Sequence, residues 1–246
     1  KPLMRSQILD IIVPTEQALS SVMYTSNCMK RNEEGDPIGK KILRIATPLL
    51  KMMACRDNVP VATASMETRG GLGYIEEWVN PRLVRDAQIG LLWEGTTNIN
   101  ALDVITRAVK KENSGKALLE DIELLLNRAT ACPGQLKTIL KNTMKRAVDF
   151  ADAVAQNESN EFQCRRAAAG LYHAKTAALL AFEGSKIGDS GGDARRLILS
   201  RLVVDLRLAP KDPLALDESK FQMEAAALLI DDKPVNLDKA INLISL

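Results

Sequence analysis

The chain has 246 residues, of which 46% are hydrophobic, 26% are charged and only 4% are aromatic. Its formal net charge of +2 gives no electrostatic reason to expect a nucleic acid or a membrane surface as a partner. The length is enough for one large core or two smaller ones, and every apolar run is shorter than the roughly 18 to 20 residues that span a bilayer.

The four cysteines lie far apart and form no CxxC pair, and the chain has a single histidine. This distribution argues against a zinc site and predicts free thiols in a reducing compartment. The cysteines are Cys28, Cys55, Cys132 and Cys164, and the histidine is His173.

Apolar residues recur at spacings of three and four along almost the whole chain, which predicts an all-α fold. A first helix is expected over residues 6–30, kinked or broken at Pro14, followed by a loop over residues 31–39. A second helix is expected over residues 40–58, and a separate short helix over residues 59–69 leads to the Gly70-Gly71 pair.

Residues 98–111 predict an amphipathic helix with basic residues in its last turn, where cations are favourable. The following "ENSGK", residues 112–116, is typical of a linker. We therefore predict a domain over residues 1–112 and a second helical domain over residues 113–246. In the second, Leu136, Leu140 and Met144 begin one apolar helix face, and Asp193 is expected to cap a later helix.

The chain begins with "KPLMRSQILDIIVP", which has no signal-peptide pattern and looks like the middle of a protein. We expect a fragment or a processed product.

The segment "WEGTTN", residues 93–98, has the form of a turn that enters a helix. Free N–H groups and the helix dipole favour an anion at such a position. Gly95 permits a close approach to the backbone, and Thr96, Thr97 and Asn98 can cap the helix or bind a ligand. Glu94 is either a residue that complements the dipole, which spacing alone favours, or a carboxylate base tuned by apolar neighbours and the helix end.

Other candidates have simpler interpretations. His173 lies on a helical pattern without a partner at ligand spacing, so we expect it to pack or to face solvent. "GGLGY" is expected to be a turn, Met52 and Met53 core residues, and Arg85-Asp86 an ion pair or a helix-end contact. Two basic clusters are expected to be solvated helix faces rather than phosphate-binding surfaces. They are Lys141, Lys145 and Arg146, and Arg195, Arg196 and Arg201.

The order of motifs in residues 66–100 is more specific than any one of them. It runs Gly-Gly-x-Gly-aromatic, Glu-Glu, x-Arg-Asp and aromatic-Glu-Gly-Thr, and then enters an amphipathic helix. This order resembles the C-terminal helical domain of the flavin-dependent acyl-CoA dehydrogenases. "TPLLKMMACRDNVPVATASMETRGGLGYIEEWVNPRLVRD", "WEGTTNI" and the helical tail resemble the AidB branch of that superfamily. The motif-bearing match covers residues 40–111, and the resemblance implies a helical bundle followed by an extra helical extension.

By this resemblance, Glu94 matches the base that removes the α-proton of an acyl-CoA thioester, while the β-hydride passes to FAD. Trp93 and Gly95 match positions that line the substrate pocket. Thr96 and Asn98 match positions that contact the phosphate and adenosine portion of FAD. The segment that reaches the FAD of a neighbouring subunit is matched by Glu67, Gly70 and Gly71. Glu67 stands where many relatives carry Gln.

The resemblance also implies non-covalent FAD, an acyl-CoA substrate of fatty acid metabolism, and an acceptor such as an electron-transfer flavoprotein. It implies a homotetramer, in mitochondria or peroxisomes of a eukaryote or the cytoplasm of a bacterium. The N-terminal helical domain and the middle β-domain of the superfamily are not among these residues, so we expect this chain alone to be nearly inactive and to hold FAD weakly. An alternative is an AidB-like module that sequesters acyl-CoA or contacts nucleic acid and has little dehydrogenase activity.

Overall fold

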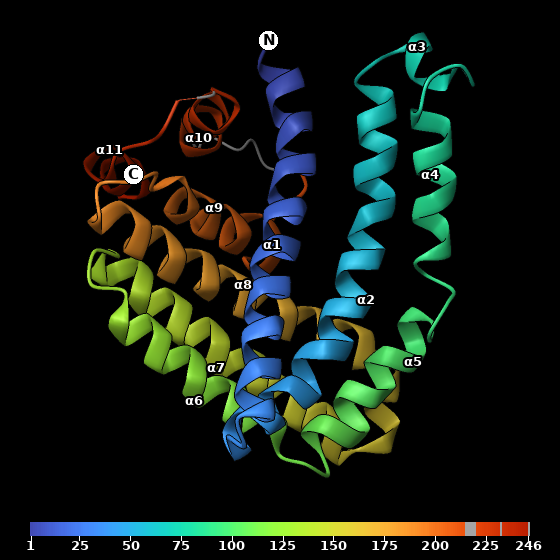
Figure 1. Ribbon diagram of the computed structural model, residues 1–246, viewed down its shortest axis with the longest axis vertical. Coiled ribbons are helices and arrows are strands. Elements are labelled where there is room, and N and C mark those ends of the chain that lie inside the picture. Colours follow the sequence, from blue (N-terminus) through green and yellow to red (C-terminus); the bar gives the residue numbers. More distant parts are fainter. Residues whose placement is uncertain (215–219, 232, 246) are drawn as a thin grey trace.

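The computed structural model describes residues 1–214, 220–231 and 233–245, and all of its regular elements in this part are helical. The all-α prediction is therefore confirmed. Two long helices, α1 (Pro2–Glu33) and α2 (Pro37–Glu67), form an antiparallel pair. Beside α2 lie α4 (Asn80–Ile89) and, at its far end, the single turn α3 (Gly71–Tyr74) (Figure 1).

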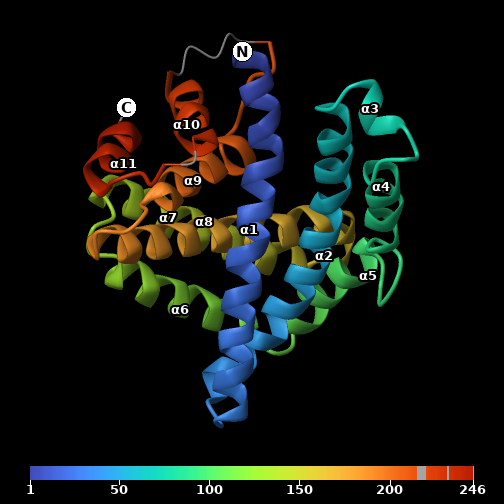
Figure 2. The same ribbon diagram turned by 45° about the horizontal axis from the view of Figure 1, so that its top comes forward.

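The chain then returns through α5 (Thr97–Leu102), which continues as the π-helical segment η1 (Asp103–Val109). The remaining elements stack beside the α1–α2 pair, with α8 across it behind both helices (Figure 2). They are α6 (Ser114–Arg128), α7 (Gly134–Gln156), the 3-10 segment η2 (Glu158–Gln163), α8 (Cys164–Asp189), α9 (Arg195–Val203), the π segment η3 (Val204–Leu208), α10 (Lys220–Ile230) and α11 (Leu237–Ile244).

Buried apolar residues of all the long helices form one continuous core. The predicted apolar face of α7 is buried at Leu136, Leu140 and Met144, and Met52 and Met53 of α2 are core residues as expected. Residues on both sides of the predicted boundary at residue 112 contribute to this core. The division into residues 1–112 and 113–246 remains a prediction.

Prolines interrupt α1 and α2 less than expected. Pro14 lies inside α1, and both Pro48 and Pro60 lie inside α2, which runs without a break to Glu67. The prediction of a separate short helix over residues 59–69 was therefore wrong. Packing against α4 keeps this part of α2 helical although Pro60 lacks a backbone N–H donor.

The two predicted loops are also shorter than expected. Only residues 34–36 separate α1 from α2, because Asp36 accepts a hydrogen bond from the Ile38 backbone N–H at 2.8 Å and pairs with Arg31 at 2.7 Å. The predicted linker over residues 112–116 is mostly helix, since α6 begins at Ser114, where Ser114 and Gly115 are buried. Asn113 makes the turn in the left-handed conformation, with φ of 53°.

Candidate functional site

The loop that joins α4 to α5 holds Glu94. Glu94 and Gly95 both have positive φ angles, 50° and 96°, and Glu94 is one of two such non-glycine residues in the described part of the chain. This conformation disfavours a residue with a Cβ atom, so neighbouring groups must hold it in place. As predicted, the loop leads directly into a helix, which begins at Thr97.

Two side chains, from α2 and α5, hold this loop in place. The ammonium group of Lys51, on α2, donates hydrogen bonds to the carbonyl oxygens of Gly90 at 2.6 Å and Gly95 at 3.2 Å. The Nδ2 atom of Asn100, on α5, donates to the carbonyl oxygens of Gly95 at 2.9 Å and Thr96 at 3.0 Å. Both ends of the loop are thereby fixed to α2 and α5.

The Glu94 side chain lines a groove with a volume of about 980 Å³. One wall is the first half of α2 and the other is formed by the loop, α5 and η1. Besides Glu94 and Lys51, the charged residues that line it are Lys40, Lys41, Arg44, Asp103 and Glu112.

An ion-pair network lies along the wall of this groove. Arg44 donates two hydrogen bonds to Asp103, at 2.7 and 2.9 Å, and one to Glu112 at 2.9 Å. The hydrogen bonds from Arg44 to Asp103 are the main cause of a raised pKa at Arg44, so its guanidinium stays charged. The network ties α2 to η1 next to the Glu94 loop.

The Glu94 side chain is exposed and makes no hydrogen bond or ion pair with residues that the structure describes. Its apolar neighbours do not bury it, because Leu92 and Trp93 are themselves 68% and 60% exposed. The carboxylate is free to meet a molecule that enters the groove.

Of the two roles considered for the residues at the start of α5, capping or ligand binding, the structure does not show side-chain capping by Thr96. Thr96 occupies the N-cap position, but its hydroxyl accepts no hydrogen bond from the helix. Thr96 and Asn98 are exposed, and neither side chain has a hydrogen-bond partner among the described residues. The backbone N–H groups of Glu94 and Gly95 likewise have no acceptor in the described chain. The loop thus presents unpaired donors beside a free carboxylate.

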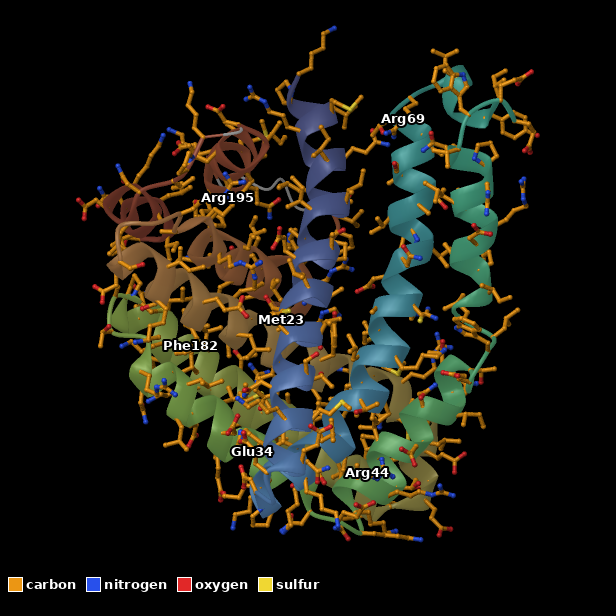
Figure 3. The ribbon with its side chains drawn as sticks, viewed as in Figure 1. Met23, Glu34, Arg44, Arg69, Phe182 and Arg195 are labelled. Carbon is orange, nitrogen blue, oxygen red and sulfur yellow. The ribbon has the colours of Figure 1, made fainter. Side chains whose placement is uncertain are left out.

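Glu67, Gly70 and Gly71 lie far from this loop, at the other end of α2. Sixteen residues of helix separate Lys51 from Glu67, a distance of about 24 Å at 1.5 Å per residue. Figure 3 labels Arg44, in the first part of this helix, and Arg69, just past its far end. Glu67 accepts a hydrogen bond from Gln7 at 2.9 Å, and a Cβ atom added to Gly70 or Gly71 would meet nothing within 4 Å. The predicted site residues therefore form two separate groups.

Several other candidates have structural roles. His173 is buried and its Nδ1 atom lies 3.1 Å from Gln17 Nε2, which confirms a packing role. Arg85 pairs with Glu76 at 2.9 Å and Asp86 with Arg82 at 3.5 Å. Of the two alternatives considered, an ion pair between Arg85 and Asp86 was therefore wrong, because neighbouring residues of a helix point in different directions.

The basic cluster on α9 is part-buried and held in internal ion pairs, with Arg195, Arg196 and Arg201 only 29%, 19% and 28% exposed, so the expected solvated helix face was wrong for this cluster. Arg196 pairs with Glu16 and Glu183, and Arg201 with Asp205. On α7, Lys145 pairs with Asp149 at 3.6 Å.

The four cysteines are free thiols, as expected. No group of three or more His, Cys, Asp or Glu side chains in the described residues is placed to hold a metal ion. Among the same residues, no helix is both long and apolar enough to cross a membrane.

Residues 1–110 match the family described as acyl-CoA dehydrogenase, C-terminal domain. Acyl-CoA dehydrogenase family member 11 of Caenorhabditis elegans is 31% identical over 167 residues, which are 64% of this chain and 27% of that protein. The putative acyl-CoA dehydrogenase AidB of Escherichia coli is 38% identical over 78 residues, 32% of this chain and 14% of that protein. The chain thus spans only about a quarter or less of the length of these relatives.

Solved structures agree with this match. The crystal structure of C. elegans ACDH-11 in complex with C11-CoA has a TM-score of 0.73 and 26% identity, over 86% of this chain and 37% of that one. An acyl-CoA dehydrogenase complexed with FAD from Bacillus anthracis has a TM-score of 0.65 over 99% of this chain and 48% of that one. At 17% identity, this second likeness shows the fold alone.

Proposed function

We propose that this chain, which belongs to the acyl-CoA dehydrogenase superfamily and corresponds to the C-terminal portion of its members, takes part in α,β-dehydrogenation of an acyl-CoA thioester. Glu94 is the proposed base. The single observation that carries the proposal is the free Glu94 carboxylate, held at the groove on a loop that Lys51 and Asn100 fix. The match to AidB over 78 residues supports placement in the AidB-like branch.

Removal of an α-proton from a thioester needs a carboxylate within reach and donors for the developing enolate oxygen. Glu94 supplies the carboxylate, which takes the proton as the Cα–H bond breaks. The unpaired backbone N–H groups of Glu94 and Gly95 supply donors on the same loop. Both residues precede the helix that begins at Thr97, and neither N–H group has an acceptor within the described residues, so both are available to a substrate.

The residues of this chain fit FAD only at the edges of its site. The unpaired side chains of Thr96 and Asn98 can hydrogen-bond a phosphate or a ribose at the start of α5. A second flavin would contact Glu67, Gly70 and Gly71. These residues lie too far from Glu94 along α2 to belong to the same site, which supports this assignment. When bound, FAD accepts the β-hydride; this chain's part is to hold it and to remove the α-proton.

Trp93 and Gly95 flank the base and would contact the acyl and thioester portion of the substrate. The C11-CoA bound by C. elegans ACDH-11 supports an acyl-CoA substrate for this chain. We further propose a homotetramer that passes electrons to an electron-transfer flavoprotein.

A large apolar surface supports the view that other parts of the protein, or neighbouring subunits, complete the site. The residues from α3 to α5 include exposed apolar side chains, among them Leu72 (63%), Tyr74 (77%), Trp78 (58%), Val79 (57%), Leu92 (68%) and Trp93 (60%). Such a surface is typical of an interaction face. The chain alone is therefore expected to be nearly inactive and to bind FAD weakly. Stoichiometric flavin absorbance in the purified 246-residue chain would contradict this expectation.

The decisive test is Glu94→Gln in the full-length protein, with substrate α-proton exchange and the flavin spectrum as readouts. A general base contributes about 10² to 10⁴ in rate, so exchange should fall by that factor while the flavin spectrum stays unchanged. Glu112→Gln is a matched control, since Glu112 lines the same groove but pairs with Arg44. Exchange that is unchanged in Glu94→Gln would exclude Glu94 as the base and favour the alternative of a binding module without turnover.

A further inference from the structure

A second pocket lies on the other side of α2 from the Glu94 groove. Its volume is about 320 Å³, and it is formed by α2, the start of α5, the first turns of α8 and the end of η3. Figure 1 shows the first turns of α8 behind α2 and α5. Its polar lining is dominated by four arginines, which are Arg56, Arg165, Arg166 and Arg207.

None of these four guanidinium groups has an ion-pair partner within the described residues. All four side chains are exposed at the pocket, so a ligand can reach them from solvent. Among the described residues, Asp57 is the one carboxylate that lines the pocket; it is buried, and its Oδ2 atom has no hydrogen-bond partner there. The pocket therefore gathers four positive charges against at most one negative charge.

The position of two of these arginines is unfavourable without a bound anion. Arg165 and Arg166 lie in the first turn of the 26-residue helix α8, where the positive end of the helix dipole disfavours cations. The guanidinium of Arg166 stacks on the Phe150 ring at 5.2 Å, which restrains its position. An anion between these groups would remove the repulsion among them.

The remaining wall adds no counter-charge. His173 lines the pocket, and burial lowers its pKa to about 3, so the imidazole is neutral. An adjoining groove of about 960 Å³ shares Arg166, His173 and Arg207 with the pocket. It offers room for the organic part of a larger ligand.

We propose that this pocket binds the phosphate groups of a small phosphorylated ligand, with the pyrophosphate group as the best match. Planar guanidinium forks bind phosphate oxygens in pairs, and four of them suit an anion with more charge than one carboxylate carries. Asp57 limits the affinity, because it repels the anion from within the pocket. The pocket does not include Glu94, and its four arginines are not among the residues assigned to FAD, although its Thr97 lies between Thr96 and Asn98.

The test is calorimetric titration of the 246-residue chain with inorganic pyrophosphate at low salt. Arg207→Gln and Arg165→Gln should each weaken binding by about tenfold or more, because each removes charge-assisted hydrogen bonds. Arg82→Gln, an exposed arginine on α4, is the matched control and should bind as the parent chain does. Asp57→Asn removes the negative charge with little change in shape and should tighten binding.

Two further ligands identify what the pocket recognises. If ADP and pyrophosphate bind with the same affinity, the pocket recognises the phosphates alone. If ADP binds more tightly, the adjoining groove also contacts the ligand; either result supports the proposal. Equal affinities in the parent chain, Arg207→Gln and Arg165→Gln would overturn it. Binding of duplex DNA through these arginines, without competition by pyrophosphate, would overturn it in favour of a nucleic-acid surface.

Discussion

The Nζ atom of Lys51 lies 3.2 Å from the carbonyl oxygen of Gly95, so helix α2 holds the residue that follows Glu94. The same ammonium group holds the start of the loop through the carbonyl oxygen of Gly90 at 2.6 Å. One side chain therefore fixes both ends of the segment that carries the proposed base. The position of Glu94 depends on α2 as much as on its own loop.

Lys51→Met should loosen this loop while the fold is retained. The change removes two charge-assisted hydrogen bonds at a half-buried position, so we expect a loss of about 1 to 2 kcal/mol in the free energy of unfolding. Hydrogen exchange of residues 90–96 should become faster than in the parent chain. Lys40→Met is the control, since Lys40 lines the same groove without a hydrogen bond to the loop. Unchanged exchange in Lys51→Met would show that Asn100 alone holds the loop.

The Arg44–Asp103 pair should contribute measurably to stability. Their side chains are only 29% and 25% exposed and share two hydrogen bonds. A double-mutant cycle with Arg44→Gln and Asp103→Asn should give a coupling energy of about 1 kcal/mol that decreases as salt rises.

The Arg85–Glu76 pair offers a comparison for this cycle. It has a similar distance of 2.9 Å, but its side chains are 62% and 70% exposed. Solvent screens such a pair, so the same cycle there should give no measurable coupling. Equal coupling in the two pairs would show that burial does not strengthen the Arg44–Asp103 interaction.

Periodicity of the apolar residues was enough to predict the helical fold, because each long helix buries one stripe in the core. Leu136, Leu140 and Met144 were predicted on one face of α7 and are buried there. Helix ends were predicted less well. Pro60 is tolerated inside α2 because of tertiary packing, and Asp36 shortens the first loop through its bonds to Ile38 and Arg31. Neither effect is visible in the spacing of apolar residues.

The candidate site was predictable only in part for the same reason. The motif around Glu94 indicated a turn before a helix, and the structure has that turn. Lys51 was not predicted, because its contacts to Gly90 and Gly95 span 39 and 44 residues and depend on how α2 packs against the loop. Asn100 lies close enough in sequence to be found, since an Asn four residues after an N-cap can reach the cap carbonyl; no such role was assigned to it.

The pH dependence of stability should report the burial of Lys175. This side chain is 0% exposed, and its one hydrogen bond within the described residues goes to the Ser21 hydroxyl at 2.7 Å. Burial lowers its pKa from 10.5 to about 7. Between pH 7 and 10.5 the unfolded chain binds a proton that the folded chain does not. The free energy of unfolding therefore rises with pH in this window, by at most about 1.4 kcal/mol per pH unit. This gain in stability is lost again as the pH falls from 10.5 towards 7.

Denaturation of the parent chain and Lys175→Met at pH 7.5 and 8.5 tests this assignment. Cys28 and Cys132, whose pKa values burial raises from 9.0 to about 11, act in the opposite direction, but their effect is small below pH 9 and is present in both proteins. The stability of the parent relative to Lys175→Met should increase by about 1 kcal/mol from the lower to the higher pH. Lys186→Met, at an exposed position on the same helix, should show no such change. A difference that stays constant with pH would mean that Lys175 remains charged in the folded chain.

The close contact of α8 with α9 should make Gly184 intolerant of any side chain. A Cβ atom at Gly184 would lie 2.5 Å from the backbone nitrogen of Leu197 and 2.9 Å from the carbonyl carbon of Arg196, so the two helices would have to separate. Gly184→Ala should therefore lower the free energy of unfolding by about 1 to 3 kcal/mol.

Gly170, in the same helix, provides the matched control. A Cβ atom there would meet nothing within 4 Å, and alanine favours the helix, so Gly170→Ala should raise the free energy of unfolding by about 0.5 to 1 kcal/mol. Urea denaturation of both variants measures the difference between them. If both substitutions had the same sign of effect, helix propensity and not the α8–α9 contact would determine the outcome at Gly184.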